Sequence, residues 1–291
     1  MWFARVVWIT LPLSLSGPID DATEMWNAAP RLVVVGLASS AWMIGIVALF
    51  APRPRSFTVL RVVAPGAVVA AFVTVRAEPT AMTWLAVVHA AVAAFALLHA
   101  AVADRCADGA SYGNERRHPL RLPPQFSLFF VPVAVGTTIG GVLLGPWWLA
   151  DRRWIAGSIA MALGVPAVIV AIRALVAVER RFVVFVPAGF VVSDSIVLVD
   201  PVLFPREHVV HMAAADDRQA GLPDARPGVL DLRLGTPGAV ELVVDEPAPI
   251  PCRNGRTASR TVDAARVLFA PLRPSFVVSE WNERVQPGRP R

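Results

Sequence analysis

The residues that could bind a metal or act on a substrate are few in this sequence. The one cluster of metal-ligand types is Glu207-His208-Val209-Val210-His211, and its spacing is neither HExxH nor HxxEH. On a strand, His208 and His211 would point to opposite faces, so we interpret them as surface residues. No GxSxG elbow, P-loop or dinucleotide fingerprint occurs. We therefore expect no metal site, no cofactor and no catalytic motif, and an enzyme that uses scattered residues stays open.

Two aspartates and two cysteines are expected to have structural roles rather than catalytic, metal-binding or redox roles. Asp194 and Asp200 are predicted to lie in turns, because aspartate satisfies nearby backbone donors there. Cys106 and Cys252 lie far apart and form no CxxC pair, so we expect two thiols rather than a disulfide or a redox site.

One histidine falls inside an apolar run that is long enough to be a membrane helix. His89 lies near the middle of Ala81–Ala103, and His99 lies near its end. On a helix the two rings would be about 80° apart, which is poor geometry for a shared metal. We interpret His89 as a hydrogen-bonding residue between packed helices, with an intramembrane ligand site as the alternative.

A basic segment follows that run. Arg116, Arg117 and Arg121 lie within Asp104–Gln125. These arginines could contact anionic lipid headgroups, each contributing about 1 kcal/mol near a membrane surface. The alternative, which we prefer, is that they only fix the topology of the chain.

The elements that must position these residues are mostly transmembrane helices. The chain has 291 residues, of which 55% are hydrophobic and 17% charged, and its mean hydropathy is +0.56. These values exclude an ordinary soluble domain. A helix needs about 20 apolar residues to cross a hydrocarbon core of about 30 Å. Five segments meet or approach this length: Leu32–Ala51, Thr58–Val75, Ala81–Ala103, Ser127–Ala150 and Trp154–Val178.

The first apolar run, Trp2–Ser16, is shorter than these five. It contains Arg5 and resembles a secretory signal, but Pro12 interrupts it and Pro18 follows closely. We therefore predict an uncleaved helix, short or interfacial, rather than a signal peptide.

Small residues recur in the span Ser127–Ala150. Gly136 and Gly140 form one small-xxx-small pattern, and Gly141 and Gly145 form another. Glycine at every fourth position lets a neighbouring backbone approach closely. We expect tight packing of this helix, either within the chain or between copies.

The placement of arginine predicts the orientation. Cytoplasmic loops near span ends carry an excess of basic residues. Gly17–Arg31 is mostly acidic and is predicted outside, whereas Arg53-Pro54-Arg55, Asp104–Gln125 and Arg180-Arg181 are predicted inside; Arg152-Arg153 is the exception. We expect a multi-pass protein of the inner cell membrane with a cytoplasmic C-terminal domain.

The net charge of +5 belongs to the membrane part of the chain. Residues 1–178 contain 13 arginines and 8 acidic residues, whereas residues 179–291 contain 14 of each. Nucleic-acid binding would require the positive charge to gather on a soluble face. The charge balance therefore indicates topology, and no nucleic-acid partner is expected.

The C-terminal third changes character, so we divide the chain into a transmembrane domain of residues 1–178 and a soluble β-rich domain of residues 179–291. Period-2 alternation replaces continuous apolar runs there. Two hairpins are predicted, from Phe182–Val186 with Phe190–Ser193 and from Val229–Gly235 with Ala239–Asp245. Further predicted elements are strands at Ile196–Val199 and His208–Met212, a loop at Ala213–Pro227, and helices at Thr257–Phe269 and Ser279–Arg284.

The predicted fold class is thus an all-α membrane bundle of five transmembrane helices with a short N-terminal apolar helix, followed by an α+β, β-rich domain. The helical region, the hairpin within Phe182–Asp194 and the stretch Asp200-Pro-Val-Leu-Phe-Pro-Arg-Glu-His-Val resemble the bacterial pleckstrin-homology-like (PH-like) domains attached to membrane proteins. With Trp42 and Pro52-Arg53-Pro54, the chain is also similar to an uncharacterised family of actinobacterial integral membrane proteins.

The resemblance implies a PH-like fold but no particular activity. Lipid-binding members of the eukaryotic pleckstrin fold carry basic residues in the first hairpin turn. Pro187-Ala188-Gly189 has none, so phosphoinositide binding is not implied.

These observations favour a non-enzymatic scaffold or sensor that contacts the lipid bilayer through its helices and another protein through its cytoplasmic domain. A membrane transporter or channel is the alternative, although no Asp or Glu lies within a predicted span. A membrane enzyme acting on lipid or envelope precursors is a third hypothesis. The oligomeric state and the partner's identity stay open.

Overall fold

The chain folds into two compact units. The computed structural model describes residues 1–215, 228–254 and 258–285. The helical unit comprises residues 1–109 and 130–176, and the β-rich unit comprises residues 110–129 and 177–291. The β-rich unit is therefore assembled from two separate stretches of the chain.

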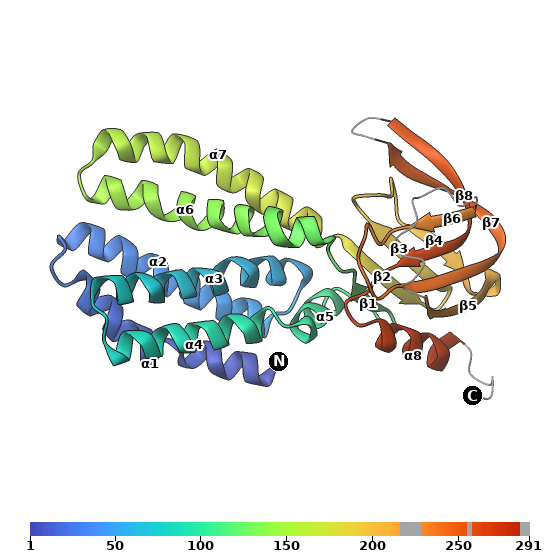
Figure 1. The fold of residues 1–291 in the computed structure, drawn as a ribbon, viewed down its shortest axis with the longest axis horizontal. Coiled ribbons are helices and arrows are strands. Elements are labelled where there is room, and N and C mark those ends of the chain that lie inside the picture. The colour runs from blue at the N-terminus through green and yellow to red at the C-terminus, as the bar shows by residue number, and fades with distance from the viewer. Residues whose placement is uncertain (216–227, 255–257, 286–291) are drawn as a thin grey trace. The chain divides into compact units, whose positions relative to one another are not determined.

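The helical unit is a bundle of apolar helices (Figure 1). Four candidate spans are long and apolar enough to cross a membrane, and α4 with α5 makes a fifth if this bent pair is one span. This is the composition of a polytopic membrane protein, as predicted. The helices are α1 (Trp2–Thr23), α2 (Ala28–Phe50), α3 (Pro54–Ala77), α4 (Ala81–Leu97), α5 (Ala100–Asp108), α6 (Val131–Ala150), which follows a π-helical turn at Phe126–Phe130, and α7 (Trp154–Val178).

The predicted span Ala81–Ala103 is not one straight helix. α4 ends at Leu97, α5 begins at Ala100, and the two helices are bent by 47°. His99 caps α5, because its ring Nδ1 accepts a hydrogen bond from the backbone N–H of Ala101 at 3.2 Å. A hydropathy pattern does not detect this side-chain cap, which is why the break was not predicted.

One of the two glycine patterns lies at a helix contact. A Cβ on Gly141 would lie 3.2 Å from the carbonyl oxygen of Gly164, and a Cβ on Gly145 would lie 2.5 Å from Met161. Both neighbours belong to α7, so Gly141 and Gly145 allow α6 and α7 to approach closely. A Cβ on Gly136 would meet nothing within 4 Å among the described residues.

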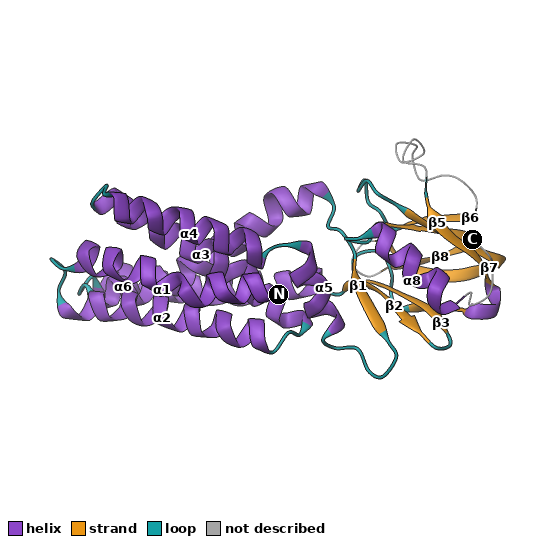
Figure 2. Ribbon diagram, turned by 90° about the horizontal axis from the view of Figure 1, so that it is seen from below, coloured by secondary structure: helices purple, strands orange, loops and turns teal. Residues whose placement is uncertain are grey.

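Two four-stranded sheets and one helix make up the described β-rich unit (Figure 2). The first sheet has the order β1-β2-β3-β4 and is antiparallel throughout, and the second has the order β5-β7-β8-β6, in which β6 runs parallel to β8. The elements are β1 (Arg116–Pro119), β2 (Arg181–Val186), β3 (Gly189–Asp194), β4 (Val202–Pro205), the 3₁₀ turn η2 (Arg206–His208), β5 (Val209–Ala214), β6 (Gly228–Asp231), β7 (Val240–Asn254), β8 (Ala258–Phe269) and α8 (Pro274–Val285).

The predicted hairpin of β2 and β3 is confirmed. The two strands pair from Arg181 with Asp194 to Val186 with Gly189. Gly189 has a φ of 151°, and a Cβ there would overlap the carbonyl oxygen of Phe204. Glycine is needed at this turn because β4 passes directly beside it.

Strand β1 was not predicted. It lies between α5 and α6, within the basic segment Asp104–Gln125 that was predicted to follow a membrane helix. It pairs with β2 from Arg116 with Phe185 to Pro119 with Phe182. Beyond β1, the backbone N–H of Leu120 donates to the Arg181 carbonyl at 3.0 Å. A short polar segment becomes a strand here because a partner far along the chain satisfies its backbone groups.

The helix predicted at Thr257–Phe269 is wrong, since Ala258–Phe269 is strand β8. Its buried residues Ala264, Val267 and Phe269 fit a helical and a strand period about equally well. Pairing with β7 decides the outcome; it runs from Val240 with Phe269 to Asn254 with Ala258 and is interrupted between Val243 and Ala248.

The second predicted hairpin, Val229–Gly235 with Ala239–Asp245, is wrong, because β6 pairs in parallel with β8 and does not neighbour β7. Some boundaries also differ from the prediction. Within Ile196–Val199, only Leu198 forms a bridge, to Cys252. The last helix is longer than Ser279–Arg284 and begins at Pro274. Most of the predicted loop Ala213–Pro227 lies outside the described residues.

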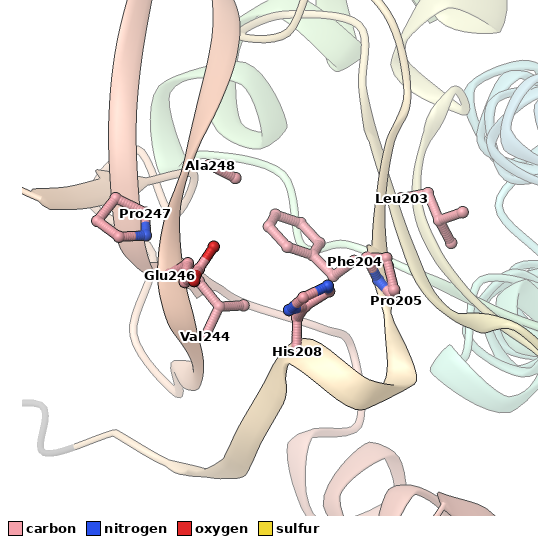
Figure 3. Close-up of a pocket in the computed structure, with 8 residues that line it drawn as sticks. All are labelled: Leu203, Phe204, Pro205, His208, Val244, Glu246, Pro247 and Ala248. Carbon is pink, nitrogen blue, oxygen red and sulfur yellow. The ribbon is translucent and has the colours of Figure 1, made fainter.

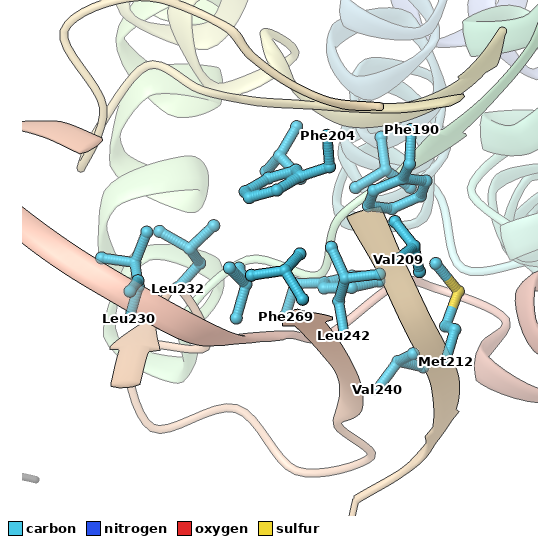
Figure 4. Close-up of a cluster of buried hydrophobic side chains, with 14 of the residues drawn as sticks. Phe190, Phe204, Val209, Met212, Leu230, Leu232, Val240, Leu242 and Phe269 are labelled. Carbon is cyan, nitrogen blue, oxygen red and sulfur yellow. The ribbon is translucent and has the colours of Figure 1, made fainter. Parts of the chain in front are cut away.

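The apolar core of the β-rich unit lies between the two sheets (Figure 4). Phe190 and Phe204 from the first sheet point toward Leu242 and Phe269 from the second. α8 adds its fully buried Val277 and Trp281 to the same cluster. Burial of these large side chains is the main stabilising contribution to the unit, at roughly 1.5–3 kcal/mol each.

Candidate functional site

One cluster of polar groups inside the helical unit lies where α1 packs on α4. The ring of His89 lies between these helices, with Nε2 3.0 Å from the Val7 carbonyl oxygen and Nδ1 2.7 Å from the Ser14 hydroxyl. The Thr10 hydroxyl lies 3.4 Å from Nε2. A carbonyl only accepts, so we assign the proton to Nε2, and in the neutral ring Nδ1 then accepts from Ser14.

This Ser14–His89 pair has the spacing of a nucleophile and its base. The Ser14 side chain is buried, with an exposed fraction of 6%, and its hydroxyl also lies 3.1 Å from the Leu11 carbonyl oxygen. A substrate would have to displace α1 to reach it. The geometry therefore supports helix packing through polar groups rather than a reaction at this serine.

A second set of contacts joins α1 to α2. The indole N–H of Trp8 donates to the Trp42 carbonyl oxygen at 3.0 Å, and the indole N–H of Trp42 donates to the Trp8 carbonyl oxygen at 2.9 Å. The Trp8 carbonyl is available because Pro12, four residues later, has no N–H to donate. Gly45 makes room for the Trp8 ring, since a Cβ there would lie 2.5 Å from the indole nitrogen.

Arg5 fixes the start of α1 to the end of α2. Its guanidinium donates to the Leu49 carbonyl oxygen at 3.0 and 3.2 Å and lies 4.6 Å from the centre of the Phe50 ring. The last carbonyls of a helix lack intrahelical donors and carry partial negative charge, which favours a cation there.

The basic segment Arg116–Arg121 belongs to the β-rich unit. Arg121 donates to the carbonyl oxygens of Pro237 at 3.1 Å and Leu272 at 3.4 Å. Arg117 pairs with Glu115 at 3.6 Å and lies 5.5 Å from the Phe182 ring centre, and Arg116 also interacts within the protein. All three arginines expected to contact lipid therefore have partners in the protein.

A buried histidine–glutamate pair in the β-rich unit was not predicted from the sequence. His118 on β1 and Glu280 on α8 are 5% and 9% exposed, and Nε2 lies 2.8 Å from the carboxylate. Arg284 binds the other carboxylate oxygen at 2.8 Å and donates to the Asn114 carbonyl at 2.6 Å. The pair joins positions 162 residues apart, so no local pattern could have indicated it.

The surroundings of Glu280 stabilise its charged form. Burial alone would raise the pKa of this carboxyl, but the hydrogen bond and charge of His118, with the charges of Arg284 and Arg116, outweigh burial and lower the pKa. The His118 ring also contacts the edges of Phe185 and Phe276, with centroids 5.5 and 5.7 Å away. The His118–Glu280 pair therefore links β1 to α8 and has a structural role.

A second buried ion pair lies at the start of the β2–β3 hairpin. Arg181 and Asp194 are 2% and 1% exposed and meet at 2.8 Å. Arg181 also donates to the carbonyls of Arg121 and Leu232, and Asp194 accepts from the backbone N–H of Ile196 at 3.0 Å. Asp194 thus satisfies a backbone donor in the turn, as expected, and also binds a buried arginine.

An open groove lies on the surface of the β-rich unit (Figure 3). Its volume is about 170 Å³, and it lies between β4 and the middle of β7. The residues that line it are Leu203, Phe204, Pro205, His208, Val244, Glu246, Pro247 and Ala248. His208 pairs with Asp245 at 3.1 Å, whereas the carboxylate of Glu246 is exposed.

Both walls of this groove offer backbone that is not fully paired. β4 is an edge strand of its sheet, and the pairing of β7 with β8 is interrupted between Val243 and Ala248. Edges of this kind can pair with an added extended chain. The groove thus combines apolar side chains with an edge strand and an interrupted ladder.

The remaining candidate groups give no metal or redox site within the described residues. No three His, Cys, Asp or Glu side chains gather there in a way that could hold a metal ion. Cys106 and Cys252 are both buried thiols. Burial raises the pKa of Cys252, an effect that the charge of Arg260 partly opposes.

No protein-family model, curated protein or solved structure matches the chain.

Proposed function

We propose that this chain is a non-enzymatic scaffold or sensor of the inner membrane whose β-rich unit is a cytoplasmic PH-like module that binds another protein. The groove between β4 and β7 is the observation that carries this proposal. It is open, has apolar walls and is bordered by strand edges, which favour an extended segment of a partner. The exposed carboxylate of Glu246 favours a lysine or arginine beside the apolar side chain that enters the groove.

The cytoplasmic orientation rests on the ends of the helical unit. Arginines 5, 53, 55, 61, 105 and 173 lie toward the end from which the chain passes into the β-rich unit. The opposite end carries four arginines, Arg31, Arg76, Arg152 and Arg153, together with the acidic residues Asp20, Asp21, Glu24, Glu78 and Asp151. The excess of basic residues supports a cytoplasmic location for the first end and for the unit that follows it.

The PH-like assignment rests on the arrangement of the β-rich unit. Two sheets enclose one apolar core, and the C-terminal helix α8 packs Val277 and Trp281 into it. The turn between β2 and β3 has no basic residue, so the proposal does not include phosphoinositide binding. The transporter alternative has less support, because the side chain of His89 is already bonded to α1.

Photo-crosslinking in cells tests the protein-binding role. A photoreactive amino acid replaces Leu203, which is 48% exposed on the groove wall, and a control chain carries it at the exposed Ser279 on α8. We expect one discrete protein adduct from position 203 that Glu246→Arg removes and that Glu283→Arg, a charge reversal on α8, retains. No adduct at 203, or the same adduct from both positions, would refute the proposal.

A further inference from the structure

One corner of the helical unit carries arginines without an acidic partner. This corner comprises the start of α1, the turn between α2 and α3, and the exposed residues Val47 and Phe50. Arg53 and Arg55 are exposed there, and neither forms an ion pair within the described part of the chain. Arg5 lies beside them, bound to the Leu49 carbonyl.

Helix α1 lies in the bundle along its length and brings its own charges to this corner. Contacts at Arg5, Trp8 and Ser14 join it to α2 and α4 over successive turns (Figure 2). Its 22 residues extend about 33 Å at about 1.5 Å per residue, and Arg5 near its start bonds the Leu49 carbonyl near the end of α2. The N-terminal amine therefore reaches the same end of the bundle as Arg53.

The opposite end of the helical unit holds both kinds of arginine: Arg76 and Arg152 are exposed there without an ion pair among the described residues, whereas two others are paired. Arg31 pairs there with Asp20 at 3.3 Å, and Arg153 pairs with Asp151 at 2.9 Å. α5 ends beside this turn, since a Cβ on Gly109 would overlap the Pro52 carbonyl oxygen, and its Asp104 and Asp108 each already have an interaction within the protein. Arg53 and Arg55 are thus available to an anion from outside the chain.

The apolar surface beside these arginines identifies the kind of anion. Val47 is 62% exposed and Phe50 is 56% exposed, one turn before the basic turn. An acyl chain would cover these side chains while a phosphate contacts the guanidinium groups. We propose that this corner binds the headgroup of an anionic phospholipid.

Native mass spectrometry of the full chain, released from vesicles that contain phosphatidylglycerol and phosphatidylcholine, tests this assignment. We expect the wild-type chain to retain phosphatidylglycerol preferentially. Arg53→Gln with Arg55→Gln should weaken that preference about 30-fold, since each arginine near a membrane surface contributes about fivefold. Arg152→Gln with Arg153→Gln, at the opposite end, should leave it unchanged.

Two outcomes would overturn the proposal. One is equal retention of the two lipids by the wild-type chain, or an equal loss in both double variants. The other is displacement of phosphatidylglycerol by glycerol phosphate at the same concentration, which would identify a site for the phosphate alone. An unchanged thermal unfolding curve of each variant shows that the bundle is intact.

Discussion

The buried pair of His118 and Glu280 predicts a large loss of stability when the histidine is removed. The His118→Ala variant loses a hydrogen bond to a charged acceptor, worth about 1.5–3 kcal/mol. It also loses the ring contacts with Phe185 and Phe276 and leaves a cavity. Arg284 still neutralises the carboxylate, so we expect about 3 kcal/mol in total rather than the upper range for an unpaired buried charge.

The chain contains a matched control for this substitution. His208 and Asp245 form a second histidine–carboxylate pair in the same unit, but their side chains are 48% and 46% exposed. Exposed pairs contribute about 0–1 kcal/mol, because water screens the charges and the side chains lose entropy. His208→Ala should therefore destabilise the unit by less than about 1 kcal/mol.

Hydrogen exchange of the full chain can measure the difference in stability between the two variants directly in β1 and α8. A loss of about 3 kcal/mol should accelerate amide exchange about 150-fold in β1 and α8, the elements that the pair joins. The same peptides should exchange less than about fivefold faster in His208→Ala. Equal protection of β1 and α8 in the two variants would show that the His118–Glu280 pair contributes no more stability than a surface ion pair.

Three further predictions concern packing and pH. Gly45→Leu should displace the Trp8 ring and lower the thermal stability of the bundle by about 1–3 kcal/mol, whereas Gly36→Leu on the same helix should have little effect, because a Cβ there meets nothing within 4 Å. His89→Ala should cost about 1 kcal/mol in the same melting experiment, in keeping with measured hydrogen bonds between membrane helices. The pKa of Glu280 is lowered in the folded β-rich unit, so the charged carboxylate stabilises the fold. This stability is present above the ordinary glutamate pKa of about 4.3 and is lost as the pH falls through the pKa of the folded state. Urea unfolding at a series of pH values should therefore show a smaller acid-induced loss of stability in Glu280→Gln than in the wild-type chain.

The parts of the fold that could be predicted are those with a local cause. Long apolar runs predicted α2, α3, α6 and α7, because crossing a bilayer sets a minimum length for each helix. The β2–β3 hairpin was also predictable, since its turn and alternation lie within one short stretch.

The parts that could not be predicted depend on distant partners. β8 has an ambiguous period, and only its pairing with β7 makes it a strand. His118 lies in a basic segment between two helices, and only the pairing of β1 with β2 makes this segment a strand. The groove at Leu203 and Glu246 likewise joins two elements whose approach no local pattern encodes.

The pairing of β1 with β2 constrains how the chain is inserted during synthesis. β1 precedes α6, and β2 follows α7, so the ladder between them forms only when both strands are on the same side of the membrane. The α6–α7 pair must therefore cross an even number of times. A chain in which one of these helices failed to insert would carry β1 and β2 in different compartments, with Glu280 separated from His118. Closure of the first sheet thus requires that α6 and α7 be inserted as a pair.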